Sequence, residues 1–176
     1  MGGGNGWRTK SAVAAASLGL ALSASAETPR GAFDVRIRHA ATADTVRAAL
    51  RGAAERLEAP GCQAVFSDFA DASGRLLSDR LVELGQTPQG YLGQVLFYDG
   101  STQPRCQARD NGVLAVTAPG SPIVFVCPEA LRAQFHRQPL VVEATLIHEA
   151  LHTLGLGENP PTSREITSRV VKRCSR

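Results

Sequence analysis

Apolar residues in the first half of the chain recur with two different periods. Residues 33–37 alternate between apolar and polar side chains, and this period of two predicts a half-buried strand. Residues 46–57 carry apolar side chains at helical spacing, so we expect a helix with Thr42 or Asp44 as its N-cap. Pro60-Gly61 is expected to stop that helix. The domain therefore opens with a strand followed by a helix.

Short apolar segments occupy the middle of the chain. Four of them are rich in β-branched or aromatic residues and predict strands: residues 64–66, 95–98, 113–117 and 123–126. The last two are separated by a Pro-Gly pair, so we expect them to form a hairpin. Residues 76–82 carry leucines at helical spacing and predict a short helix.

The last third of the chain is predicted to be helical. A short helix is expected over residues 128–135 and a final one over residues 163–173. Between them, residues 141–154 are apolar on most faces, which indicates a helix that is buried on most sides. Gly155 is expected to end it, because glycine readily adopts the left-handed conformation that closes helices. Together these elements predict one α+β domain with a sheet of about five strands.

The N-terminal segment has the pattern of a signal peptide. Basic residues precede an apolar stretch over residues 11–22, and the small residues Ala24-Ser25-Ala26 follow it. The apolar stretch is too short for a stable membrane-spanning helix. We therefore expect residues 1–26 to be removed and residues 27–176 to form the mature domain. The protein would be secreted or periplasmic, with no membrane association after the signal peptide is removed.

Charge and cysteine content narrow the classes of function. Loss of Arg8 and Lys10 with the signal peptide lowers the formal net charge from +3 to +1, which argues against a nucleic-acid partner. The four cysteines all lie in the mature domain: Cys62, Cys106, Cys127 and Cys174. An even number in an exported chain predicts two disulfides, and the sequence leaves all three pairings open. A cysteine-based zinc site would need close pairs such as C-x-x-C, which this spacing does not provide.

The buried helix contains the sequence His148-Glu149-Ala150-Leu151-His152. Residues four apart project from one face of a helix, so both imidazoles can reach a single ion. Zinc suits such a site because it binds neutral imidazole nitrogens and can keep one position open for water. Bound zinc lowers the pKa of that water toward about 7, and Glu149 is placed to take its proton. We therefore expect one zinc ion bound by His148 and His152, with Glu149 as the catalytic base.

A catalytic zinc site normally has a third protein ligand, and two carboxylates are candidates. Glu158 follows Gly155 and Gly157, where a sharp turn would bring its side chain back to the helix. Without that role it would be an ordinary solvated loop residue. Glu165 lies on the predicted final helix, where Thr162-x-x-Glu165 is also a capping-box pattern. We favour Glu158 as the third metal ligand, because the paired glycines would allow the sharp turn that brings its side chain to the metal. Glu165 remains the alternative.

Residues 148–158, HEALHTLGLGE, resemble the extended signature of the metzincin clan of zinc metallopeptidases, H-E-x-x-H-x-x-G-x-x followed by a third ligand. The resemblance covers 11 residues. In that clan the final position is usually His, and in some small secreted bacterial members Asp, whereas Glu158 occupies it here. Metzincins also share a methionine turn beneath the metal, and the only methionine in this chain is Met1. The resemblance therefore implies a minimal zincin-like fold, in which a mixed sheet and a backing helix accompany the active-site helix.

The resemblance also implies a function. A zincin-like peptidase hydrolyses peptide bonds with zinc-bound water that Glu149 deprotonates. The hairpin over residues 113–126 would lie near the cleft, where its outer edge could pair with an extended peptide, although an ordinary core hairpin would show the same pattern. We expect a secreted zinc metallopeptidase that acts as a monomer on peptide or protein substrates. The alternative is a secreted zincin-like binding protein with little turnover, which the small size and missing methionine favour and Glu149 opposes.

Overall fold

The computed structural model describes residues 1–3, 33–108 and 112–175. The chain divides into two compact units, Met1–Arg30 and Gly31–Arg176, and the second contains every helix and strand described below. The expected signal peptide, residues 1–26, lies outside the described residues except for residues 1–3. Among the helices of the described ranges, none is long and apolar enough to cross a membrane.

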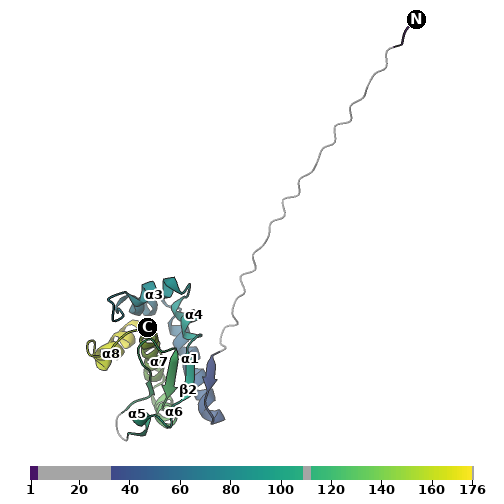
Figure 1. The fold of residues 1–176 in the computed structure, drawn as a ribbon. Coiled ribbons are helices and arrows are strands. Elements are labelled where there is room, and N and C mark those ends of the chain that lie inside the picture. Colours follow the sequence, from purple (N-terminus) through teal and green to yellow (C-terminus); the bar gives the residue numbers. More distant parts are fainter. Residues whose placement is uncertain (4–32, 109–111, 176) are drawn as a thin grey trace. The chain divides into compact units, whose positions relative to one another are not determined.

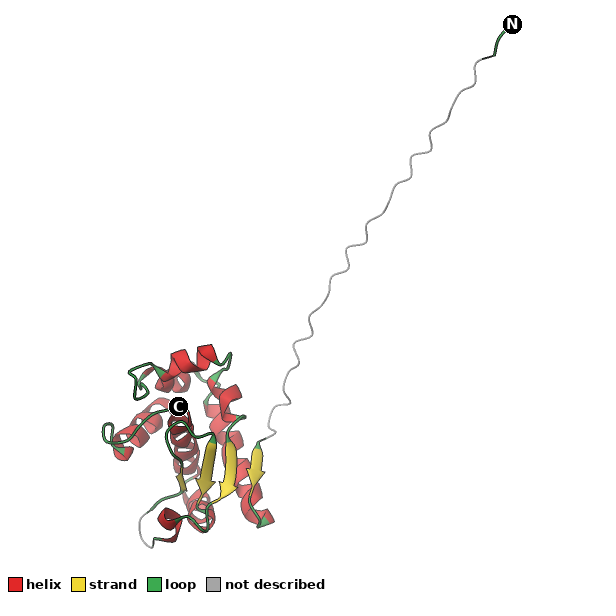
Figure 2. Ribbon diagram, in the orientation of Figure 1, coloured by secondary structure: helices red, strands yellow, loops and turns green. Residues whose placement is uncertain are grey.

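A mixed four-stranded sheet with the strand order β1-β2-β4-β3 forms one layer of the domain (Figures 1 and 2). Strands β1 (Asp34–Arg36), β2 (Leu96–Asp99) and β4 (Ile123–Val126) are parallel to one another. Strand β3 (Ala115–Val116) lies at the edge and pairs antiparallel with β4. The α+β class, the mixed sheet and the predicted hairpin are therefore confirmed.

The strand expected at residues 64–66 is wrong. These residues form a 3-10 helix, η1 (Ala64–Ser67), which continues directly from the short helix α2 (Pro60–Gln63). Val65 and Phe66 are both buried, and a short apolar run of this kind cannot distinguish a buried strand from a buried helical turn. Within the described part of the chain the sheet accordingly has four strands, where five were expected.

The longer helices occur where the apolar spacing predicts them, with one difference at the start of the first. Helix α1 (Ala40–Arg56) has His39 as its N-cap, so the expectation that Thr42 or Asp44 caps it is wrong. Ala40 and Ala41 favour helix strongly and extend it by a turn. The remaining helices are α3 (Leu77–Glu83), α4 (Pro88–Leu92), α5 (Pro104–Gln107), α6 (Pro128–Arg137), α7 (Pro139–Thr153) and α8 (Ser163–Cys174).

Helix α7 lies in the centre of the core. It packs against α1, α6 and α8 and also contacts β3 and β4 (Figure 2). Side chains alternate along β4, where Val124 and Val126 are fully buried and Phe125 is only partly covered. One face of the sheet therefore lies in the core with the helices. The elements packed around α7 thus provide a buried, apolar environment for the His-Glu motif.

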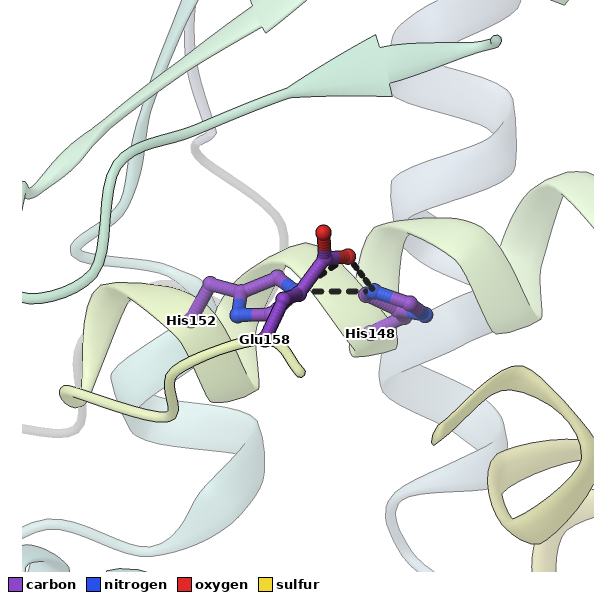
Figure 3. Close-up of side chains that lie close together, drawn as sticks. All are labelled: His148, His152 and Glu158. Carbon is purple, nitrogen blue, oxygen red and sulfur yellow. Dashed lines mark hydrogen bonds and ion pairs between the residues drawn. The ribbon is translucent and has the colours of Figure 1, made fainter. Parts of the chain in front are cut away.

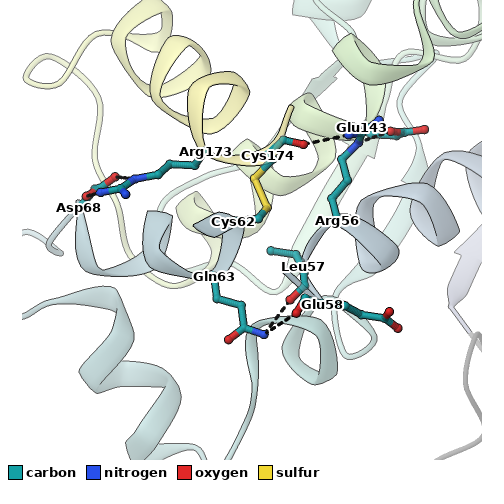
Figure 4. The surroundings of a disulfide bond; sticks show 9 residues. All are labelled: Arg56, Leu57, Glu58, Cys62, Gln63, Asp68, Glu143, Arg173 and Cys174. Carbon is teal, nitrogen blue, oxygen red and sulfur yellow. Dashed lines mark hydrogen bonds and ion pairs between the residues drawn. A yellow bond between two sulfur atoms is a disulfide. The ribbon is translucent and has the colours of Figure 1, made fainter. Parts of the chain in front are cut away.

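Two disulfides join segments that are distant in sequence. Cys62 pairs with Cys174 and Cys106 pairs with Cys127, which confirms the predicted number and decides between the three possible pairings. The first disulfide connects α2 to the last residue of α8 (Figure 4). The second connects α5 to Cys127, the residue before α6.

Candidate metal centre

Three side chains that could bind one metal ion meet at the end of α7. The Nε2 atoms of His148 and His152 are 2.9 Å apart. The Oε1 atom of Glu158 lies 3.4 Å from Nε2 of His152 and 3.8 Å from Nε2 of His148 (Figure 3). The donor atoms of the three residues all lie within 4.8 Å of one another. Two imidazole nitrogens and one carboxylate oxygen are a ligand set that zinc accepts, so these residues fit the ion that the motif predicts.

Hydrogen bonds to the far side of each imidazole hold the two rings in place. The Nδ1 atom of His152 lies 2.6 Å from the carbonyl oxygen of Leu156. A carbonyl oxygen only accepts, so Nδ1 of His152 carries the proton and Nε2 presents a lone pair to the centre. The Nδ1 atom of His148 lies 2.9 Å from the hydroxyl Oγ1 of Thr167, on α8. Partners of this kind orient the rings of metal-binding histidines.

Burial keeps the first imidazole neutral. His148 and His152 are each only 4% exposed. Loss of hydration, and then the neighbouring His152, lower the pKa of His148 from 6.5 to about 3. A neutral imidazole at neutral pH is the form that binds a metal ion.

Glu149 lies next to the first histidine in a buried position, 6% exposed. Burial, followed by the nearby charge of Glu158, raises the pKa of Glu149 from 4.5 to about 8, and Arg105 acts in the opposite direction. A carboxyl group with a pKa in this range can both accept and return a proton near neutral pH, as a general base and acid must.

A tight turn after α7 brings Glu158 back toward the histidines. Gly155 has a φ of +112°, a conformation that L side chains rarely adopt, and its N–H donates to the carbonyl of His152. The expectation that Gly155 ends this helix is confirmed. The same carbonyl of His152 accepts a second hydrogen bond from the N–H of Gly120, in the turn between β3 and β4. The hairpin therefore contacts the end of α7 that carries the candidate ligands.

In the part of the chain that the structure describes, the alternative ligand, Glu165, has a structural role. Its carboxylate accepts from the backbone N–H of Thr162 at 2.7 Å, and its own N–H donates to the Thr162 hydroxyl at 3.3 Å. These two hydrogen bonds form the capping box that the Thr162-x-x-Glu165 pattern indicates. Among the described residues, Glu158 and not Glu165 belongs to the group that could hold an ion.

Thr167 is the site residue that the sequence analysis did not identify. The final helix was predicted from its apolar positions, and Thr167 lies beside one of them, Ile166. Its place next to this apolar residue is the only signal in the sequence that the side chain of Thr167 faces the interior. Contact with His148 depends on how α8 packs against α7, which the local pattern does not encode.

Comparisons with known proteins give no further constraint on this site. No protein-family model, no curated protein and no solved structure matches the chain.

Proposed function

We propose that the protein is a secreted zinc-dependent peptidase in which His148, His152 and Glu158 bind one zinc ion and Glu149 is the catalytic base. The observation that carries this proposal is the convergence of the three donor atoms within 4.8 Å at the end of a buried helix. Glu149, which a purely structural ion would not need, follows the first histidine directly.

The chain's own residues supply the acid–base part of the chemistry. When bound, zinc lowers the pKa of a water molecule and polarises the carbonyl of a scissile bond. Glu149 takes a proton from the attacking water, and the protonated carboxyl then gives it to the leaving amine. Its burial supports this role, because a carboxyl group removed from solvent holds its proton more strongly than an exposed one.

The edge strand supports a peptide as substrate. Strand β3 lies at the edge of the sheet formed by the described residues and packs against α7. Extended peptides bind such edges by adding a strand, with main-chain hydrogen bonds that are independent of side-chain identity. A substrate that binds along β3 would pass the end of α7 where the hairpin turn contacts His152.

Two disulfides support a location outside the cytoplasm, because disulfides persist mainly in oxidising compartments. We propose that residues 1–26 direct the chain there as a signal peptide.

The test is cleavage of a peptide library by the zinc-loaded wild type and by Glu149→Gln. Glu129→Gln, which changes an exposed glutamate on α6, is the matched control. We expect cleavage by the wild type and the control, and loss of cleavage in Glu149→Gln with zinc still bound. Equal cleavage by all three proteins would refute the role of Glu149. Bound zinc without cleavage by the wild type would refute the peptidase and favour a zincin-like binding protein.

A further inference from the structure

The two imidazoles of the metal centre differ in what their Nδ1 atoms contact. His152 Nδ1 contacts the Leu156 carbonyl oxygen at 2.6 Å, which can only accept a hydrogen bond. His148 Nδ1 contacts the Thr167 hydroxyl at 2.9 Å, which can either donate or accept. The tautomer of His152 is therefore fixed by its partner, whereas the partner of His148 permits both tautomers.

The contact between the rings determines the tautomer of His148 when no metal is bound. Its Nε2 atom lies 2.9 Å from Nε2 of His152, which is a hydrogen-bond distance. Because His152 carries its proton on Nδ1, its Nε2 can only accept. Neutral His148 must then carry its proton on Nε2 and donate it to His152. With Nε2 protonated, Nδ1 of His148 is an acceptor, and the Thr167 hydroxyl donates to it.

Metal binding requires the opposite arrangement. Both Nε2 atoms must offer lone pairs to the ion, so His148 must carry its proton on Nδ1. The Nε2 proton leaves to solvent and Nδ1 takes one from solvent, so the ring stays neutral throughout. The Thr167 hydroxyl then turns its own proton away and accepts the Nδ1 proton.

We propose that Thr167 is a positioning residue whose hydroxyl donates to His148 Nδ1 in the metal-free protein and accepts from it when the metal is bound. This inference rests on the proposed metal site. Its consequence is that the first ligand changes tautomer on metal binding without leaving a ring nitrogen unpaired.

Several contacts hold α8, and with it Thr167, in place. The capping box fixes the first turn of the helix. At the other end, Cys174 is joined to Cys62, and its carbonyl oxygen accepts from Arg56 at 2.8 Å. Arg173 donates two hydrogen bonds to Asp68, at 2.6 and 2.8 Å (Figure 4). An anchored helix can keep the hydroxyl within hydrogen-bond distance of the imidazole in both states.

The first test is the tautomer itself, measured by long-range ¹H–¹⁵N correlation spectra of the histidine rings at pH 7.5 before and after one equivalent of zinc. His39→Gln and His136→Gln remove the other two histidines from the spectra. We expect His148 to be protonated on Nε2 without metal and on Nδ1 with zinc, and His152 to be protonated on Nδ1 in both states. His148 protonated on Nδ1 in the metal-free protein would overturn the proposal.

The second test is zinc affinity, measured by competition with a chromogenic chelator. Thr167→Val leaves the Nδ1 proton of His148 without a partner, so we expect the zinc dissociation constant to rise by about 10- to 100-fold. Thr167→Ser keeps the hydroxyl and should stay close to the wild type. The control is Thr45→Val, which removes from α1 a hydroxyl that donates to the carbonyl of Ala41.

Failure of this proposal differs from failure of the proposed function. Zinc binding by Thr167→Val at wild-type affinity would overturn the role of Thr167 and leave the metal centre intact. A wild type that binds no zinc would overturn the proposed function and, with it, the exchange of tautomers. The metal-free spectra would then decide only whether Thr167 donates to His148.

Discussion

Removal of the Cys62–Cys174 disulfide is expected to destabilise the protein more than removal of Cys106–Cys127. A disulfide restricts the unfolded chain by closing a loop, and the loss of entropy grows with the length of that loop. The two loops span sequence separations of 112 and 21 residues. In the chain-entropy relation these lengths correspond to about 4.8 and about 3.3 kcal/mol at 25 °C. The first pair should therefore contribute about 1.5 kcal/mol more to the free energy of unfolding.

The measurement is urea denaturation of two double variants, Cys62→Ala/Cys174→Ala and Cys106→Ala/Cys127→Ala, with a chelator present to exclude any contribution from bound metal. Both variants should retain the far-ultraviolet circular dichroism of the wild type at the start of the titration. Equal losses of stability, or a larger loss for the second variant, would refute the argument from loop length.

Other predictions concern the turn, the third ligand and the acid stability of the fold. Loss of a residue that only supports a metal ligand weakens metal binding by up to about 100-fold, so Glu158→Gln, which changes a ligand, should weaken zinc binding by more than that in chelator competition. Glu165→Gln should bind zinc as the wild type does. Weaker zinc binding by Glu165→Gln than by Glu158→Gln would refute Glu158 as the third ligand. Gly155→Ala should lower the free energy of unfolding by about 1–3 kcal/mol in urea denaturation, because residue 155 has a positive φ. Gly157→Ala, where an added Cβ has no neighbouring atom within 4 Å, should leave the free energy of unfolding unchanged. Equal losses would refute the role of the positive φ of Gly155 in this turn. Hydrogen bonds from Arg173 lower the pKa of Asp68 in the folded protein below its ordinary value of 3.8. The ionised Asp68 therefore contributes its full stabilisation above pH 3.8, and this stabilisation is lost as the pH falls through the pKa of the folded state. The stability difference between the wild type and Asp68→Asn should be larger at pH 7 than at pH 2.5, and an unchanged difference would refute this.

The helical part of the candidate metal centre was predictable because its information is local. Two histidines four residues apart on a buried helix share a face whatever the rest of the fold does. The turn to Glu158 was also accessible from sequence, since Gly155 supplies a conformation that few other residues adopt. For these residues a short stretch of chain specifies both the structure and the candidate chemistry.

Other features depend on tertiary packing or on weak local signals. The apolar run at residues 64–66 has no flanking strand pattern to identify it, and it folds as a 3-10 helix after α2. The disulfide pairing and the Thr167 contact join segments far apart in sequence, so periodicity and propensity carry no information about them. The start of α1 at Ala40 reflects helix propensity that outweighs the preferred capping residues two and four positions later.

We propose that His148, His152 and Glu158 bind one zinc ion and leave a position open to solvent. The most direct test is the zinc X-ray absorption spectrum, with the metal content, of purified folded protein after dialysis against zinc-free buffer. We expect one zinc ion per chain, bound by two imidazole nitrogens and additional oxygen ligands. A folded protein that retains no zinc, or a metal coordinated by sulfur, would contradict it.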